Sequence, residues 1–278
     1  MYFLGTMLGL AGLVALKWTG LTDMQWDELA RATLLNLFYL PHFEPHTERI
    51  FAGQVENAVF PLNNPAWSLF FELMFANVLY AISARVRHAP AVLAAVAGIA
   101  LALAAYRYGG MPGWGISNFI GGFPRVTYAF FAGVVIYQLR DRLSALGEAR
   151  PLLVVGSLTL LLGLPRLDGL REYWLAAALA GVPLLVAASV RCALQSGGAA
   201  QRLVEYSGRL SYPLYCVHYP LLMLLAAEGW RPREFIVATL LFIAASMALA
   251  HLLLVGVDEP LRRWLSAHLG RAGPRAPQ

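Results

Sequence analysis

The chain has 278 residues, of which 59% are hydrophobic and 13% charged, and its mean hydropathy is +0.59. Soluble domains carry about twice that share of charged residues, so this composition excludes an ordinary soluble protein and predicts an all-α, polytopic bundle of transmembrane helices. The net charge of +5 could suggest nucleic-acid binding, but the basic residues lie in short connections between apolar runs, where they indicate one membrane face and no nucleic-acid partner.

Eight apolar segments are long enough to be membrane spans, and together they predict a single domain over residues 1–278. They cover roughly residues 1–16, 66–84, 90–106, 124–139, 151–165, 172–190, 210–227 and 234–257. Residues 1–16 have no basic n-region and no small-residue cleavage site, so they do not form a cleavable signal peptide. Residues 17–65 form a long loop, in which the apolar segment 31–41 is too short to span and is expected to be interfacial or re-entrant.

Arginine distribution predicts the orientation, because cytoplasmic connections are richer in basic residues. The richer connections hold Arg85, Arg87, Arg140, Arg142, Arg150, Arg191, Arg202, Arg209, Arg262, Arg263, Arg271 and Arg275. The poorer ones hold Arg107, Arg125, Arg166, Arg171, Arg231 and Arg233. This bias places both ends of the chain in the cytoplasm, the basic tail 265–278 included, and the 17–65 loop outside an inner (plasma) membrane.

Glu72 stands in the apolar helix that follows Asn63, Asn64 and Pro65, within the run Asn63–Tyr80. An unpaired charge at membrane depth costs roughly 3 kcal/mol or more, which makes an intramembrane carboxylate a functional candidate. Ser68 precedes Glu72 by one helical turn and shares its face. The aromatic rings of Trp67, Phe71 and Phe75 are expected to keep the carboxylate dry. The alternative is an interfacial glutamate that is stabilised by the positive end of the helix dipole.

His42, Glu44 and His46 alternate in the outer loop, and a strand would place them on one face as metal ligands. A hydrated loop rich in proline, histidine and glutamate is the more common explanation, so no metal site is predicted. The two cysteines, Cys192 and Cys216, also lack metal-binding or redox spacing.

Residues 207–220 contain another candidate site, in which His218 follows Tyr212 and Tyr215 inside a predicted span. A buried imidazole beside tyrosines can accept or relay a proton. The alternative is a structural histidine that is hydrogen-bonded to a neighbouring helix. His251, in the last span, has no comparable neighbours in the sequence and is interpreted as structural.

The segment DEPLRRW at 258–264, with Glu259 and Pro260, is expected to mark the exit of the last span, where arginine and tryptophan suit the headgroup region.

Four stretches in this order resemble the acyltransferase 3 family of integral membrane acyltransferases. They are PAWSLFFELMF at 65–75, RVTYAFFAGVVIYQL at 125–139 (with Phe130 or Phe131 and Gly133), GRLSYPLYCVHYP at 208–220 (with Ser211 and Pro220 beside the residues already named) and DEPLRRW. Each stretch is weak alone, but the combination and its order are specific.

The resemblance also implies that this chain starts differently from typical members of the family. Members of the family typically have about ten spans, and the first span carries an arginine followed about ten residues later by the histidine taken as general base. The opening MYFLGTMLGL is similar to the family's third span, so the chain is expected to lack two spans and to be inactive without them. His218 is a different element and is not a replacement for that histidine.

The activity implied by the resemblance is transfer of an acyl group, often acetyl, from acyl-CoA to a hydroxyl of a sugar, polysaccharide or other envelope acceptor, with acyl-CoA as co-substrate and no bound cofactor. Such chemistry needs a base for the hydroxyl proton and donors for the developing oxyanion. Glu72 is then the acid/base or histidine-orienting carboxylate, Trp67 and Ser68 shape its pocket, and Arg125 meets anionic donor or acceptor groups. The competing class is a membrane transporter or scaffold, against which stands the lack of paired Gly/Pro-broken helices in two matching halves.

Overall fold

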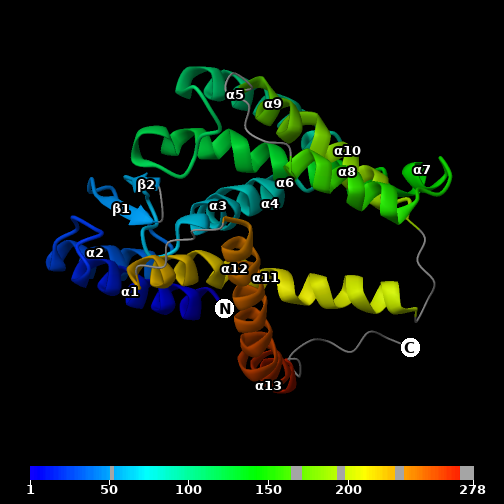
Figure 1. The fold of residues 1–278 in the computed structure, drawn as a ribbon. Coiled ribbons are helices and arrows are strands. Elements are labelled where there is room, and N and C mark those ends of the chain that lie inside the picture. The colour runs from blue at the N-terminus through cyan, green and yellow to red at the C-terminus, as the bar shows by residue number, and fades with distance from the viewer. Residues whose placement is uncertain (51–52, 164–170, 193–197, 229–234, 270–278) are drawn as a thin grey trace. The chain divides into compact units, whose positions relative to one another are not determined.

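The computed structural model describes residues 1–50, 53–163, 171–192, 198–228 and 235–269. Its contacts divide the chain into two compact units (Figure 1). The first comprises residues 1–56, 60–65 and 199–278, and the second comprises residues 57–59 and 66–198. The expectation of a single domain stays a prediction, and each unit is described by itself.

The first unit is built on α1 (Tyr2–Trp18), which packs along α11 (Ala199–Ala227). Two glycines on α1 allow close packing, Gly5 against α11 and Gly9 against the segment at Leu62. A Cβ on Gly5 would lie 2.3 Å from the carbonyl oxygen of Cys216, and a Cβ on Gly9 would lie 1.7 Å from that of Leu62. Small residues in this pattern are typical of helix contacts in membranes, where van der Waals packing replaces the hydrophobic effect. The core of the unit combines buried residues from α1, α2 (Trp26–Leu37) and α11 with Met24, Ile50 and Leu62.

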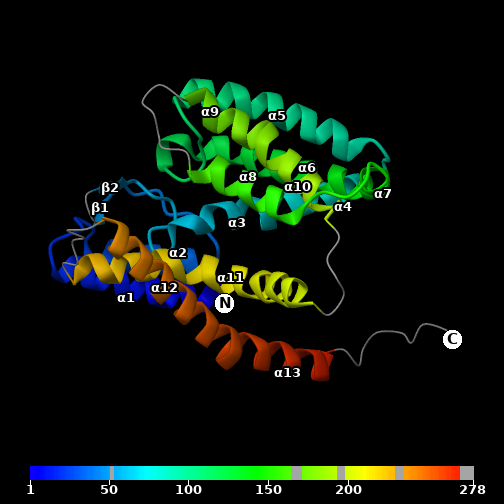
Figure 2. The same cartoon turned by 45° about the vertical axis from the view of Figure 1, so that its right-hand side comes forward.

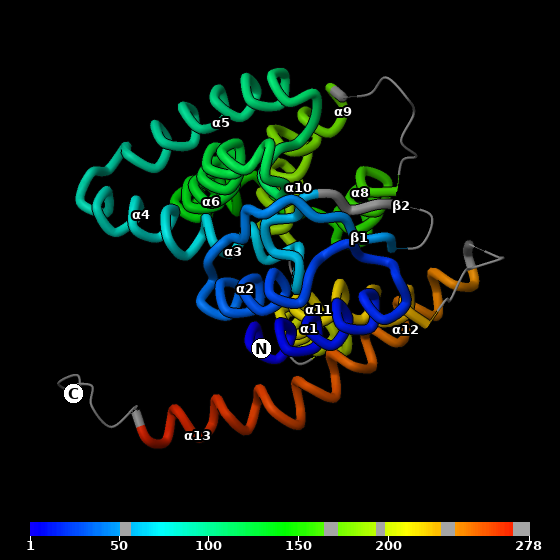
Figure 3. The backbone as a smooth tube through the Cα atoms, turned by 90° about the vertical axis from the view of Figure 1, so that its left-hand side faces the viewer, coloured from blue at the N-terminus to red at the C-terminus, as the bar shows by residue number. Residues whose placement is uncertain are grey.

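The segment between α1 and the second unit carries most of the irregular structure. It contains α2 and a hairpin of β1 (Thr47–Ile50) and β2 (Gly53–Glu56), which pair antiparallel from Thr47 with Glu56 to Ile50 with Gly53 (Figure 3). A capping box starts α2: the Glu28 carboxylate accepts a hydrogen bond from the Gln25 backbone N–H at 3.0 Å. The predicted loop 17–65 is therefore folded over much of its length, and α2 overlaps the apolar segment 31–41.

The C-terminal helix of the first unit is long. It runs from α12 (Phe235–Leu253) through a π-helical turn, η5 (Leu254–Asp258), into α13 (Glu259–Leu269), as Figure 2 shows. The predicted exit at Glu259-Pro260 therefore lies inside a continuing helix. Residues 270–278 of the predicted tail lie outside the described residues.

The second unit consists of helices and their connections. A short 3₁₀ turn, η1 (Asn64–Ala66), leads into α3 (Trp67–Phe71), a π-helical turn η2 (Glu72–Ala76) and α4 (Asn77–Ser83). There follow α5 (Ala89–Tyr108), η3 (Ile116–Gly121), α6 (Gly122–Gln138), α7 (Arg140–Ser144), α8 (Pro151–Gly163), α9 (Arg171–Ala176), η4 (Ala177–Gly181) and α10 (Val182–Ser189). The helix α6 is central, because it contacts α3, η2, α5 and α10.

The helices confirm the predicted fold class. Within the described residues, six helical runs are long and apolar enough to cross a membrane: Asn64–Ser83, Ala89–Tyr108, Ile116–Gln138, Glu172–Ser189, Ala199–Ala227 and Val237–His268. Two shorter apolar helices, Tyr2–Trp18 and Pro151–Gly163, correspond to the other two predicted segments. The orientation stays a prediction, and Arg166, Arg231, Arg233, Arg271 and Arg275, on which it partly rests, lie outside the described residues.

Candidate active site

The helix that carries Glu72 changes its winding at that residue. Pro65 lies in the opening 3₁₀ turn, where a missing backbone N–H costs nothing, and α3 follows. The π-helical turn begins at Glu72, and the Asn77 side-chain amide donates to the Glu72 carbonyl oxygen at 2.9 Å. Single π turns inside α-helices occur frequently at functional sites, because they turn a side chain away from the regular helical face. The change of winding thus coincides with the charged residue that the sequence analysis identified, although π-helical turns also occur at η4 and η5.

Glu72 lines a cavity of about 370 Å³ together with Trp67, Ser68 and Arg125. The remaining wall is apolar and comes from α6, through Val126, Ala129 and Phe130. The Glu72 side chain is exposed. The structure therefore places in one pocket the four residues that the sequence analysis assigned to the carboxylate site.

Arg125 is held at the rim of this pocket by two contacts. Its Nη1 donates to the Pro112 carbonyl oxygen at 3.0 Å, and its guanidinium carbon lies 4.8 Å from the centre of the Trp67 ring. A guanidinium over an indole face gains cation–π attraction, which is strongest for tryptophan. These contacts fix the plane of the guanidinium and leave most of its five N–H donors for other partners.

Behind the pocket, an aromatic cluster packs α3 and η2 against α6. The buried Phe71 ring lies 4.7 Å from both Phe119 and Phe123, and Phe75 lies 4.4 Å from Phe123 (ring centroids). Gly122 makes room, since a Cβ there would lie 2.2 Å from the Phe71 ring. Phe71 and Phe75 therefore support the helix from behind. The expectation that they cover Glu72 is wrong, because Trp67 and Phe130 are the aromatic residues that line the cavity.

The tyrosines and histidine of residues 212–218 lie in the first unit, on α11. The Tyr215 hydroxyl donates to the Pro65 carbonyl oxygen, and the His218 Nδ1 lies 3.1 Å from the Leu214 carbonyl oxygen. The rings of Tyr215 and His218 are 6.2 Å apart, and Tyr212 interacts with Tyr39. Because a carbonyl only accepts, His218 donates from Nδ1 and its Nε2 is the acceptor in the neutral ring. A catalytic role for this group stays a prediction.

The acidic residues of the segment 258–264, the predicted exit of the last span, form ion pairs with arginines. Glu259 pairs with Arg209 on α11 at 3.0 Å, and with Arg263 at 3.3 Å. Asp258 pairs with Arg262 at 2.7 Å. The motif therefore ties α13 to α11, and Pro260 lies inside the continuing helix, two residues after the π-helical turn η5 ends.

His251 corrects one expectation. Its sequence neighbours include no tyrosine or other partner for the ring, but the Tyr206 hydroxyl lies 3.0 Å from its Nδ1. These two residues are 45 positions apart, on α11 and α12, so sequence spacing alone could not bring them together. The contact is consistent with a structural role.

Sequence reasoning missed a buried polar cluster in the first unit. Glu48 on β1 is fully buried, accepts a hydrogen bond from the Tyr219 hydroxyl at 2.9 Å, and lies 3.5 Å from the His46 Nε2. Burial raises the pKa of Glu48. Burial lowers the pKa of His46, but its hydrogen bonds to Glu48 and to the Glu44 carbonyl outweigh this effect, so its pKa is raised.

The interpretation of residues 42–46 as a hydrated loop is wrong for its two histidines. His42 and His46 are 1% and 2% exposed. Burial lowers the pKa of His42, so its imidazole is kept neutral. Glu44, which is partly exposed, pairs with Arg31 at 3.0 Å. The alternation of the three residues was the available signal, but the burial of the two histidines is decided by tertiary packing, which alternation does not reveal.

A protein-family model described as an acyltransferase domain matches residues 3–255, which is most of the chain. No curated protein and no solved structure matches.

Proposed function

The chain belongs to the acyltransferase 3 family of membrane acyltransferases, and from this premise we propose that it moves an acyl group, acetyl in the simplest case, from acyl-CoA to a hydroxyl of a sugar, polysaccharide or other envelope acceptor. Acyl-CoA is the co-substrate, and no bound cofactor is needed. The bilayer, the acyl-CoA donor and the carbohydrate are the partners in this proposal.

The observation that carries the proposal is the pocket that joins Glu72, Ser68, Trp67 and Arg125. In acyl transfer, the acceptor oxygen attacks the thioester carbonyl carbon, the C–S bond breaks, and the acceptor proton must leave. The Glu72 carboxylate takes this proton, directly or through an imidazole that it orients, and the departing thiolate is finally protonated to the thiol. A positioned base of this kind contributes about 10²–10⁴-fold to the rate.

Arg125 supplies the positive charge that the reaction also needs. Its guanidinium plane is set by Trp67 and the Pro112 carbonyl, so the donors that remain are preorganised. Preorganised donors stabilise developing negative charge and bind phosphate groups in bidentate fashion. In this proposal Arg125 binds an anionic group of the donor or acceptor, and Ser68 and Trp67 shape the space beside it.

The experiment follows labelled acetyl groups. Membranes that contain the protein, expressed from its complete reading frame, are incubated with acetyl-labelled acetyl-CoA, and label is measured in the lipid, glycan and soluble fractions. Wild-type protein should label a hydroxyl-bearing acceptor, with release of CoA in equal amount. The Glu72→Gln variant should not, whereas Glu148→Gln, which changes an exposed carboxylate elsewhere in the second unit, should label as wild type does. Equal labelling by Glu72→Gln would contradict the assigned site, and transport of label without covalent transfer would favour a transporter.

The arginine bias extends the proposal to localisation. With both ends of the chain cytoplasmic in the inner membrane, residues 17–65 and the start of the Asn64–Ser83 helix face the outer side. Glu72 then lies about 9 Å below Ala66, the last residue of the opening 3₁₀ turn, at 1.5 Å rise per residue over six residues. This depth suits an acceptor that arrives from outside.

A further inference from the structure

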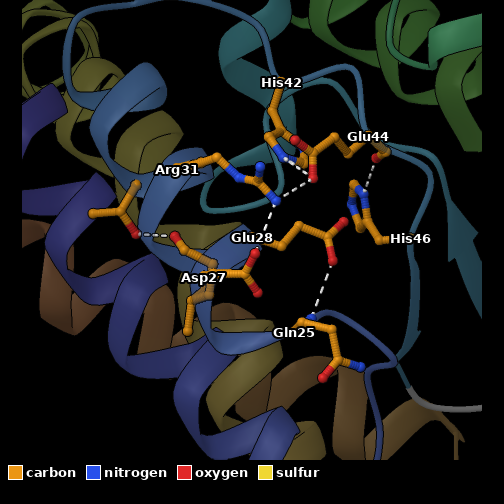
Figure 4. Close-up of polar contacts among 9 residues, drawn as sticks. Gln25, Asp27, Glu28, Arg31, His42, Glu44 and His46 are labelled. Atoms are coloured by element: carbon orange, nitrogen blue, oxygen red, sulfur yellow. Dashed lines mark hydrogen bonds and ion pairs between the residues drawn. The ribbon is translucent and has the colours of Figure 1, made fainter.

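Three side chains in the first unit converge in a way that the acyl-transfer proposal does not use. Glu28 comes from the first turn of α2, and His42 and Glu44 come from the connection that leads to β1. One ligand atom from each, a histidine nitrogen and two carboxylate oxygens, lies within 4.8 Å of the others. Figure 4 shows the labelled side chains from α2 and from residues 42–46 pointing toward one another.

The environment of His42 distinguishes this group from an ordinary cluster of acidic residues. Its side chain is 1% exposed, and within the described residues neither ring nitrogen has a hydrogen-bond partner. Its Nε2 lies 4.0 Å from the Glu44 Oε2. Buried polar atoms are nearly always satisfied, and leaving one unpaired costs about 1–3 kcal/mol. A neutral imidazole that is buried, unpaired and directed at two carboxylates has the chemistry of a metal ligand.

We propose that Glu28, His42 and Glu44 bind a divalent transition-metal ion of the zinc class. One imidazole nitrogen with two carboxylate oxygens suits zinc, whereas magnesium and calcium prefer sites made of oxygen alone. Ligand atoms around zinc lie closer together than 4.8 Å, so the three side chains must close in by about 1 Å on binding. The ion would join α2 to the segment before β1.

The neighbouring polar groups leave this site open and limit its size. Glu28 uses its Oε2 for the Gln25 backbone N–H, and a carboxylate has a second oxygen to offer. The His46 ring lies 5.8 Å from the His42 ring, but its nitrogens contact the Glu44 carbonyl oxygen and Glu48. Three protein ligands therefore leave a fourth position for water, as in zinc sites that are not purely structural.

Arg31 is the group that opposes metal binding. Its Nη2 lies 3.0 Å from the Glu44 Oε2 and 3.0 Å from the Asp27 Oδ2. The guanidinium holds Glu44 by one oxygen and brings positive charge to the edge of the site. A metal ion would compete with Arg31 for Glu44. Removing the guanidinium should therefore raise the affinity for the metal.

The test is zinc binding by the purified, full-length protein in detergent, after treatment with EDTA and dialysis. Isothermal titration should show one tight zinc site per chain, with much weaker binding of magnesium. Glu28→Gln preserves the acceptor oxygen that caps α2 but removes the charged ligand, and His42→Gln removes the imidazole. Each should lower zinc affinity about 100-fold or more, because loss of even an outer-shell partner typically costs 10–100-fold.

The controls are His88→Gln and Glu148→Gln, which change exposed residues of the second unit and should bind zinc as wild type does. Arg31→Gln should bind zinc more tightly. Cobalt in place of zinc should give the intense visible bands of a four- or five-coordinate ion, and Glu28→Gln should lose them. Zinc affinity that is equal in Glu28→Gln and wild type, or absent in wild type, would overturn the proposal, as would an equal loss in His88→Gln. Because none of these readouts depends on acyl transfer, they are independent of the proposed function.

Discussion

Replacing Gly9 with alanine should weaken the first unit. The new Cβ would lie 1.7 Å from the Leu62 carbonyl oxygen, and the clash is with backbone, which cannot rotate away. Ordinary contact distance is about 3.5 Å, so α1 or the segment at Leu62 must shift by about 1.5–2 Å. Overpacking of this kind costs typically 1–3 kcal/mol, against about 1 kcal/mol that alanine gains over glycine in a helix. Because the clash is severe and is with backbone, the upper end of the overpacking range applies, and the net loss should be about 2 kcal/mol.

The assay is thermal unfolding in detergent, followed by tryptophan fluorescence. At about 2–4 °C per kcal/mol for a unit of this size, Gly9→Ala should lower the Tm by roughly 4–8 °C. Gly156→Ala is the matched control, because Gly156 lies on α8 with no heavy atom within 4 Å of its Cβ position. It should leave the Tm unchanged or raise it slightly. An unchanged Tm for Gly9→Ala would refute the close packing of α1.

Three further predictions concern the buried Glu48–His46 pair, the position of Arg125 and the orientation in the membrane. Because the pKa values of Glu48 and His46 are both raised, their stabilising effect is present at low pH and is lost as pH rises through the folded-state values. In chelated buffer, the Tm of wild type should therefore fall as the pH rises above the ordinary histidine value of about 6.5, and by more than the Tm of Glu48→Gln falls. Arg125→Lys keeps the charge but loses the planar contacts with Trp67 and Pro112, so kcat/KM should fall about tenfold, and an unchanged value would exclude a positioned guanidinium. A reporter after Gln278 should be cytoplasmic, and one at the exposed turn of Gly20 should be external; the reverse result would disprove the arginine-based orientation.

Periodicity and composition predicted the helices well, because a helix of the required length depends on local sequence alone. The grouping of Ser68 with Glu72 also followed from local spacing, and Trp67 is in the same turn. Arg125 could be joined to them only through the family resemblance, since 53 positions separate it from Glu72 and the contact depends on how α6 packs.

The predictions from sequence were wrong where tertiary contacts decide which side chains are buried. The spacing of Phe71 and Phe75 relative to Glu72 suggested that they line its pocket. In the structure, the absence of a side chain on Gly122 lets the Phe71 ring pack against α6 instead. His42 and Glu48 are polar residues in a polar loop, yet α2 and the Tyr219 hydroxyl of α11 bury them. A π-helical turn at Glu72 has no recognised sequence signature, so the altered winding of that helix could be found only in the structure.

The most direct test of the central assignment is the turnover number of Glu72→Gln for acyl transfer, with Glu148→Gln as control. The measurement uses the protein expressed from its complete reading frame and matched for insertion in the membrane. The amide keeps the volume of the side chain but cannot take a proton, so turnover should fall about 10²-fold or more, the scale of general acid–base groups. Glu148→Gln should retain the wild-type rate. A near-native rate for well-inserted Glu72→Gln would show that the carboxylate is structural and that the reaction takes place elsewhere.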